Sequence, residues 1–168
     1  AARGYATTYD NCADVVIPNG GTATCTITNN DIAPQLKLVK SVVTDNGGNE
    51  GANDWTLTAT GTNGFSDLGG ADVFHAVNAN VAYALSESAV SGYAAGSWSC
   101  EGGKLVNGSI TLNEGEIATC TITNDDIAPK LTLVKKVIND NGGTASASNF
   151  TLTASGTNIS ETSFAGSE

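Results

Sequence analysis

Apolar and polar side chains alternate along most of this chain, and no apolar period of 3.6 residues persists for three turns. Alternation with a period of two is typical of half-buried β-strands, whose successive side chains point to opposite faces. Turn signals rich in glycine and asparagine, such as DNGG at 45–48, separate the alternating runs. The pattern predicts about seven strands in the central part of the chain. They lie near 35–44, 53–60, 71–77, 80–88, 92–100, 104–112 and 115–124.

One stretch of the chain occurs twice. Residues 25–48 read CTITNNDIAPQLKLVKSVVTDNGG and residues 120–143 read CTITNDDIAPKLTLVKKVINDNGG, with 18 of 24 positions identical at an offset of 95 residues. Further matches pair 54–63 with 149–158, and GYAT at 4–7 with GYAA at 92–95. A fixed period of this size indicates a tandem array of domains.

The repeat divides the chain into three pieces. We expect 1–32 to be the C-terminal part of one repeat, 33–127 a complete repeat, and 128–168 the N-terminal part of the next. A unit of about 95 residues with short strands and frequent turns predicts an all-β, Ig-like sandwich of two sheets. Either the chain is a piece of a longer array, which we favour, or partial repeats of neighbouring chains complete each other.

The chain has a net charge of −10, from seven Lys and Arg residues against seventeen Asp and Glu residues. Nucleic acids and anionic membrane surfaces bind basic patches, so this balance argues against both as partners. The sequence contains no apolar run of about 18 residues, and this segment is therefore not expected to insert into a membrane.

The four cysteines form two local pairs, Cys12 with Cys25 and Cys100 with Cys120. Each pair occupies the same place in its repeat, before and within the last strand. An even number of cysteines without a CxxC motif favours disulfides, and therefore an extracellular or cell-surface location. A zinc site is the alternative, but it requires closer ligand spacing and further ligands.

Three polar residues fall on strand faces that should point into the core. Counted in steps of two, Lys40 shares a face with leucines of the first strand, Glu87 with Leu85, and Asn124 with Ile122. A buried Lys or Glu is costly unless it is paired or neutral. One repeat therefore directs a Lys, a Glu and an Asn inward from three different strands.

Two interpretations of these residues are open. In the first, Lys40 and Glu87 form an ion pair and Asn124 caps a strand end. In the second, burial removes a proton from Lys40, whose amine attacks the side-chain carbonyl of Asn124 while Glu87 carries protons. The product is an amide bond between the two side chains, with release of ammonia. Lys135 and Asn29 hold the same positions in the partial repeats.

Three short motifs, LVK on the first strand, SESAVSGY at 86–93 and ITND at the end, give the unit a family resemblance. It resembles the prealbumin-like, CnaB/SpaA-type repeats of bacterial surface proteins. The resemblance implies a prealbumin-like sandwich in which a first-strand Lys is joined to a last-strand Asn, assisted by the Glu before the GY motif. Those positions are Lys40, Asn124 and Glu87 in this sequence. The cysteine pair is an addition to the commonest pattern of such repeats.

Acidic residues cluster at the seam between repeats. Asp125 and Asp126 end the complete repeat, and Asp140 lies in the turn that follows. Carboxylates and amides are ligands of Ca²⁺, so a calcium site is one interpretation. The other is that Asp and Asn initiate turns at these positions. No further cofactor is expected.

Two aromatic residues, Trp55 and Phe150, occupy equivalent positions in consecutive repeats. This equivalence predicts core residues rather than a platform for a sugar ring.

The sequence predicts a structural function, as a segment of a large extracellular fibre, stalk or adhesin. The expected partners are the neighbouring repeats of the same protein and further copies in a fibre. The alternative is an adhesive module that binds a glycan or a host protein through loops near 61–70 or 101–108. An enzyme is not expected, because the sequence contains neither a phosphate-binding loop nor a Ser-His-Asp set.

Overall fold

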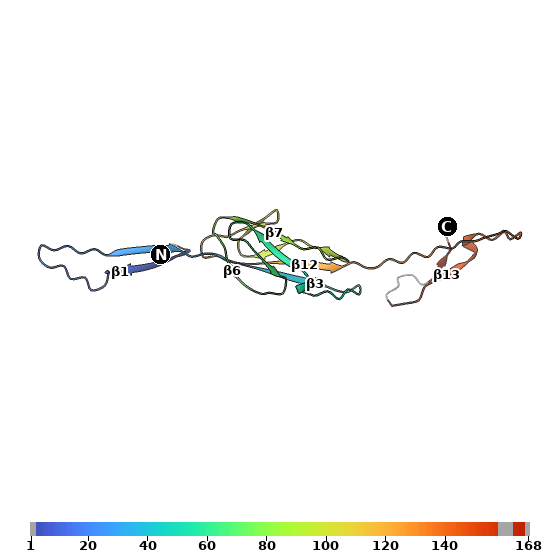
Figure 1. Ribbon diagram of the computed structural model, residues 1–168, viewed down its shortest axis with the longest axis horizontal. Coiled ribbons are helices and arrows are strands. Elements are labelled where there is room, and N and C mark those ends of the chain that lie inside the picture. Colours follow the sequence, from blue (N-terminus) through green and yellow to red (C-terminus); the bar gives the residue numbers. More distant parts are fainter. Residues whose placement is uncertain (1–2, 158–162, 167–168) are drawn as a thin grey trace. The chain divides into compact units, whose positions relative to one another are not determined.

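The computed structural model of the chain describes residues 3–157 and 163–166 (Figure 1). The chain separates into two compact units, Ala1–Ala128 and Pro129–Glu168. Positions 158–162 and 167–168 of the predicted third repeat, 128–168, lie outside the described residues.

Within the first unit, residues 33–127 form a sandwich of two β-sheets (Figure 1). The strands of one sheet are β4 (Thr56–Thr60), β5 (Phe65–Leu68), β7 (Ala82–Glu87), β10 (Lys104–Val106) and β11 (Ser109–Thr111). This sheet has the order β10-β11-β7-β4-β5, and its neighbouring strands are all antiparallel.

The second sheet contains the first and last strands of the repeat. Its members are β3 (Gln35–Val43), β6 (His75–Ala76), β8 (Tyr93–Ala95), β9 (Ser99–Glu101) and β12 (Ile117–Asp126). The order is β6-β3-β12-β8, and β9 also pairs with β12. β3 and β12 are parallel neighbours, whereas the other pairings are antiparallel. The chain therefore enters and leaves the repeat on adjacent strands.

The core lies between the sheets and follows the predicted alternation. Every second residue is buried from Leu36 to Lys40 in β3 and from Ala118 to Asp126 in β12, and the residues between them are more exposed. The buried apolar residues are Leu36, Leu38, Trp55, Leu57, Ala59, Val77, Tyr83, Leu85, Ile110, Leu112, Ala118, Cys120 and Ile122. The prediction of an all-β sandwich of two sheets is confirmed.

Several strands differ from their predicted bounds. The expected strand 104–112 is a hairpin, because Asn107 and Gly108 both take positive φ (48° and 75°) and form a two-residue turn. The expected strand 92–100 is divided into β8 and β9. β5 lies within 61–70, where a free loop was expected, and a 3₁₀ turn, η1 (Ala52–Asp54), precedes β4.

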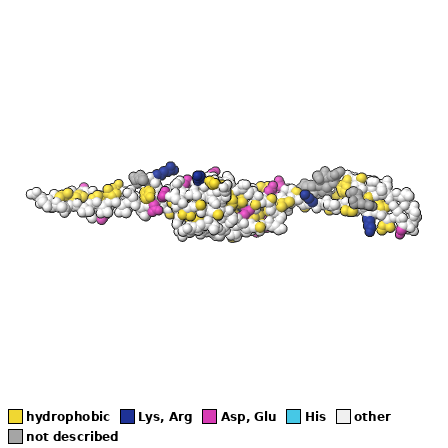
Figure 2. Space-filling view, turned by 90° about the horizontal axis from the view of Figure 1, so that it is seen from above, with side chains coloured by type: hydrophobic (Ala, Val, Ile, Leu, Met, Phe, Trp, Pro, Cys, Tyr) yellow, Lys and Arg dark blue, Asp and Glu magenta, His cyan; other side chains and the backbone are white. Residues whose placement is uncertain are grey.

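The N-terminal hairpin and the described part of the second unit contain fewer strands than the sandwich. β1 (Tyr5–Asp10) and β2 (Thr26–Asp31) form an antiparallel hairpin. Apolar side chains of this hairpin, such as Tyr9 and Ile27, are exposed (Figure 2). The second unit contains η2 (Ala147–Asn149) and the pair β13 (Thr151–Thr153) and β14 (Ser163–Ala165). Nowhere in the described part of the chain is a helix long and apolar enough to cross a membrane.

Both expected disulfides are present. Cys100 and Cys120 are directly opposite in the β9–β12 pairing, with Cα atoms 4.0 Å apart. Cys12 and Cys25 join the two arms of the hairpin beyond the ends of β1 and β2, with Cα atoms 4.7 Å apart. The first bond therefore anchors β9 to the central strand of the sheet, whereas the second closes an exposed loop.

We expect the double variant Cys100→Ala/Cys120→Ala to lower the free energy of unfolding of the sandwich by about 3 kcal/mol. The reason is that this bond closes a loop of 20 residues in the unfolded chain. Urea denaturation followed by the fluorescence of the buried Trp55 measures the effect. The matched control is Cys12→Ala/Cys25→Ala, which should change the same transition much less. Equal effects of the two double variants would contradict the conclusion that the Cys100–Cys120 bond anchors the sandwich and the Cys12–Cys25 bond does not.

Candidate cross-linking site

Three strands bring Lys40, Glu87 and Asn124 together inside the sandwich. Lys40 on β3 and Asn124 on β12 continue the inward-facing sets of their strands and are only 5% and 3% exposed. Lys40 is paired with Ile122 in the parallel register, so Asn124 occupies the next inward position along β12. Glu87 is the last residue of β7, in the opposite sheet.

The carboxyl group of Glu87 bridges the other two side chains. Its Oε2 accepts a hydrogen bond from Nζ of Lys40 at 2.5 Å, and its Oε1 accepts one from Nδ2 of Asn124 at 2.8 Å. The amine and the amide nitrogen therefore contact the two oxygens of one group. A carboxyl group in this position can take a proton from one nitrogen and deliver a proton to the other.

Lys40 lies against apolar and small residues. Its Nζ is 4.6 Å from the centroid of the Trp55 ring, and Trp55 in turn packs edge-on against Tyr93. A Cβ atom at Gly69 would lie 2.4 Å from Cβ of Lys40, so only glycine leaves room for the lysine stem. Burial lowers the pKa of Lys40, and the hydrogen bond and charge of Glu87 oppose this shift without cancelling it. The neutral amine, which is the nucleophilic form, is thereby favoured.

The side-chain carbonyl of Asn124 completes the set. Among the described residues, Oδ1 of Asn124 and Nε1 of Trp55 are the buried side-chain polar atoms without a hydrogen-bond partner. Buried polar atoms are nearly always hydrogen-bonded, and each exception in a native structure calls for an explanation. The desolvated amine of Lys40 and the side-chain amide of Asn124 thus contact the same carboxyl group. An amine so placed can attack the amide carbonyl and displace its nitrogen.

The partial repeats contain separate parts of this site. In the second unit, Nζ of Lys135 lies 4.2 Å from the centroid of the Phe150 ring, as in the complete repeat. In the hairpin, Asn29 is exposed and its Oδ1 accepts a hydrogen bond from the hydroxyl of Thr7 at 2.6 Å. Within the ranges 3–157 and 163–166, neither partial repeat assembles a Lys, a Glu and an Asn.

The residues that surround the amine are not apparent as its neighbours from the sequence. The equivalence of Trp55 and Phe150 predicts core positions, and Trp55 is fully buried whereas Phe150 is 37% exposed. The equivalence of Trp55 and Phe150 is the feature of the sequence that could indicate a contact between ring and amine, because each ring accompanies a lysine of the LVK motif. Gly69 gave no such signal, since a glycine pair in this sequence predicts only a turn.

Asp126, two residues after Asn124, holds the turn that follows β3. Its carboxylate oxygens accept hydrogen bonds from the backbone N–H of Asn46 at 3.0 and 2.9 Å and from that of Gly48 at 2.6 Å. Burial alone would raise the pKa of Asp126, but the hydrogen bonds from Gly48 and Asn46 outweigh burial and lower it. Asp126 thereby joins the end of the repeat to the DNGG turn at 45–48.

Two of the predicted calcium ligands, Asp125 and Asp126, lie beside Asp45, which the sequence did not indicate as a ligand. Carboxylate oxygens of Asp125 and Asp126 lie within 4.8 Å of one another and of Asp45. Asp140 belongs to the second unit. The oxygens of Asp126 already accept backbone N–H groups, so the turn interpretation accounts for this residue, and the calcium site stays a prediction.

Comparison with known proteins gives one family match. The sequence profile of a prealbumin-like fold domain of the SpaA type matches residues 31–122 and 126–168. The starts of the two matches are separated by the same 95 residues as the repeated stretch. No match was found among the curated proteins or among the solved structures.

We expect Asp126→Asn to destabilise the sandwich at neutral pH, because the amide is a weaker acceptor for the N–H groups of the 45–48 turn. The folded pKa of Asp126 is lowered, so its contribution is present at neutral pH and is lost as the pH falls through that folded pKa. The difference in melting temperature between wild type and variant should therefore shrink between pH 7 and about pH 2.

The control for this measurement is Asp125→Asn, which removes an exposed neighbouring carboxylate and should leave the melting temperature at neutral pH nearly unchanged. A difference between wild type and Asp126→Asn that is independent of pH would show that charge is not the cause.

Proposed function

The chain belongs to the prealbumin-like fold domain family, and we propose that it is a structural segment of a large extracellular surface protein such as a fibre, stalk or adhesin. In this proposal the complete repeat is closed by an isopeptide bond between Lys40 and Asn124. The observation that carries it is the carboxyl group of Glu87, which contacts both reacting nitrogens. Domains of the SpaA type occur in cell-surface proteins, and two disulfides are consistent with an oxidising compartment.

The reaction needs no group beyond the three side chains. The neutral amine of Lys40 attacks Cγ of Asn124, and a new C–N bond forms as the carbonyl becomes tetrahedral. Glu87 takes a proton from the attacking nitrogen through Oε2 and delivers one to the amide nitrogen through Oε1. The bond from Cγ to Nδ2 then breaks and ammonia leaves. The products are one secondary amide, one ammonia and an unchanged Glu87.

The competing interpretation is a permanent ion pair of Lys40 and Glu87. A buried ion pair must offset the desolvation of both charges, which is costly in an apolar site. The lowered pKa of Lys40 shows that the attraction of Glu87 does not fully offset this burial. An ion pair also leaves Oδ1 of Asn124 without a role, whereas the cross-link uses its carbonyl. These points favour the cross-link.

A link at this position suits a chain under tension. The repeat begins with β3 and ends with β12, so a pulling force enters at Gln35 and leaves near Asp126. A bond from Lys40 to Asn124 carries that force directly between the two strands. Residues 41–123 then bear no load, and their hydrogen bonds no longer limit the mechanical strength of the domain. The partners in this function are the neighbouring repeats and further copies of the protein.

We expect the intact mass of the purified chain to fall short of the disulfide-bonded sequence mass by one ammonia, about 17 Da. Lys40→Arg and Glu87→Gln should restore the full mass, since the first removes the nucleophile and the second the proton carrier. Mass spectrometry after proteolysis should find one branched peptide that contains positions 40 and 124.

The matched control is Lys37→Arg, which changes the same strand on its opposite face and should keep the mass deficit. A succinimide at an Asn-Gly sequence would also lose ammonia, but its formation would not depend on Lys40. A full mass for the folded wild-type chain would exclude the isopeptide bond.

Force spectroscopy on the chain held at its two ends tests the mechanical function. We expect no gain in length from residues 41–123 of the wild type. In Lys40→Arg, with the disulfides reduced, the same residues should add about 3.5 Å each. Extension of the wild-type sandwich by the full amount would contradict the proposed path of the force.

A further inference from the structure

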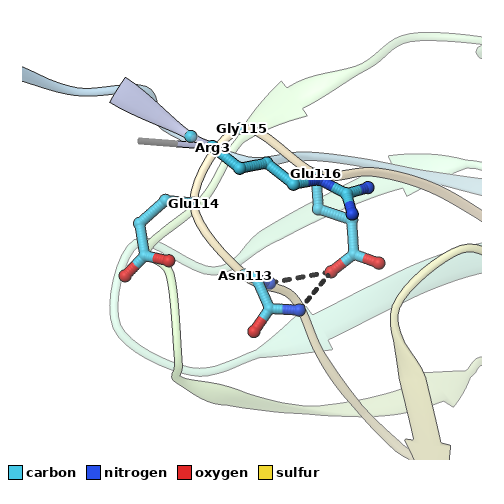
Figure 3. Close-up of a pocket in the computed structure, with 6 residues that line it drawn as sticks. Arg3, Asn113, Glu114, Gly115 and Glu116 are labelled. Atoms are coloured by element: carbon cyan, nitrogen blue, oxygen red, sulfur yellow. Dashed lines mark hydrogen bonds between the residues drawn. The ribbon is translucent and has the colours of Figure 1, made fainter. Parts of the chain in front are cut away.

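The N-terminal hairpin contacts the sandwich at the turn made by Asn113, Glu114, Gly115 and Glu116 (Figure 3). The backbone N–H of Ile32 donates to the carbonyl oxygen of Gly4 at 2.8 Å. The N–H of Gly115 donates to the carbonyl oxygen of Ile32 at 2.7 Å. Backbone hydrogen bonds therefore run from one arm of the hairpin to the other and then into the turn.

The backbones at this contact touch directly. Gly4 has a φ of 85°, and a Cβ atom there would lie 2.5 Å from the carbonyl oxygen of Glu114. A Cβ atom at Gly115 would lie 3.2 Å from Cα of Gly4. No side chain fits at Gly4 without displacing the turn, so the sequence leaves this position empty for the approach of another backbone.

The turn that receives the hairpin is itself held from several sides. Oε2 of Glu116 accepts hydrogen bonds from the backbone and side chain of Asn113 at 2.8 and 3.1 Å, and Oε1 accepts one from the N–H of Gly103 at 2.9 Å. Hydrogen bonds from the backbone of Asn113 and Gly103 lower the pKa of Glu116, and Arg3 adds a smaller effect. Figure 3 shows Arg3 reaching from the start of the hairpin toward Glu116. Glu114 accepts a hydrogen bond from Asn80 at 2.8 Å.

The end of the complete repeat has the same backbone arrangement as this end of the hairpin. Gly92 and Ile127 are the counterparts of Gly4 and Ile32, and the N–H of Ile127 donates to the carbonyl oxygen of Gly92 at 2.8 Å. Gly92 has a φ of 83°, but nothing lies within 4 Å of the position that its Cβ would occupy. The backbone conformation therefore does not depend on the contact, and the end of the repeat is preformed for it.

We infer that the 113–116 turn is a docking surface for the glycine–isoleucine end of the preceding repeat, and that the two form a rigid joint. The inference rests on the proposed tandem array, in which the hairpin is the end of a repeat. An Ile-Ala-Pro linker alone would restrict the backbone of a few residues but leave the two domains free to reorient. The joint adds a hydrogen bond to Ile32 of the linker and a direct backbone contact at Gly4, on the other arm of the hairpin, and two points of attachment oppose bending.

Residual dipolar couplings of the full chain test the joint. The amides of β1 and β2 and those of the sandwich should fit one alignment tensor. In Gly4→Ala the hairpin couplings should shrink about twofold or more and no longer fit that tensor, and the amide of Gly115 should exchange at least about tenfold faster. Separate tensors in the wild type, or unchanged couplings in Gly4→Ala, would overturn the inference.

Two glycines with the same backbone conformation provide matched controls. Gly92→Ala and Gly20→Ala introduce the same unfavourable φ (83° and 76°) at positions with nothing within 4 Å. Both should leave the common alignment of hairpin and sandwich intact, so an effect restricted to Gly4→Ala is due to the contact with Glu114. If Gly4→Ala does not fold, the wild-type couplings still decide between a joint and a flexible linker.

The test of the joint does not depend on whether the cross-link between Lys40 and Asn124 forms. A full intact mass together with a single alignment tensor would remove the isopeptide bond and keep the joint. A mass deficit together with two tensors would do the opposite.

Discussion

The structure of the repeat depends on the burial of one amine. Lys40 is on a strand whose other inward residues are two leucines and a valine, and a charged ammonium group at that depth is unfavourable unless it is neutralised or bonded. The neighbours of Lys40 each reduce that cost by a different means. Trp55 presents its ring to the amine, Gly69 leaves room for the stem, and Glu87 accepts its hydrogen bond. Burial nevertheless outweighs the hydrogen bond and charge of Glu87, so the pKa of Lys40 is lowered from its ordinary value.

Much of this site could be predicted from the alternation of residues along single strands. A period of two decides the face of each side chain, so Lys40, Glu87 and Asn124 could all be assigned to the interior. The same count, continued by one step, also places Asp126 inward, although the strand predicted from the sequence ends at 124. Alternation does not give the partner across the sandwich, however. That Glu87 meets Lys40 depends on the β4–β7 register and on the packing of two sheets, which a single strand does not specify.

Comparison of Lys40 with Lys135 separates the contacts made by residues nearby in the sequence from those made by distant residues. Lys135 already lies over Phe150 in a unit that contains only the first strands of a repeat. The ring that faces the amine therefore comes from neighbouring sequence. The carboxyl group and the amide come from β7 and from β12, the last strand of the complete repeat. They reach the amine only through pairings between strands that are distant in sequence.

The end of β12 performs three tasks within four residues. Asn124 reaches the amine, and Asp126 accepts the N–H groups of the 45–48 turn. The N–H of the next residue, Ile127, donates to the carbonyl oxygen of Gly92, and these two residues are the counterparts of Ile32 and Gly4 in the hairpin. Alternation explains how these tasks coexist, since inward positions serve the interior while the backbone of the last residue serves the neighbour. In the proposed tandem array, tension that crosses from one repeat to the next passes through this hydrogen-bonded segment. These contacts offer a physical reason for the near-identity of ITNNDIAP at 27–34 and ITNDDIAP at 122–129.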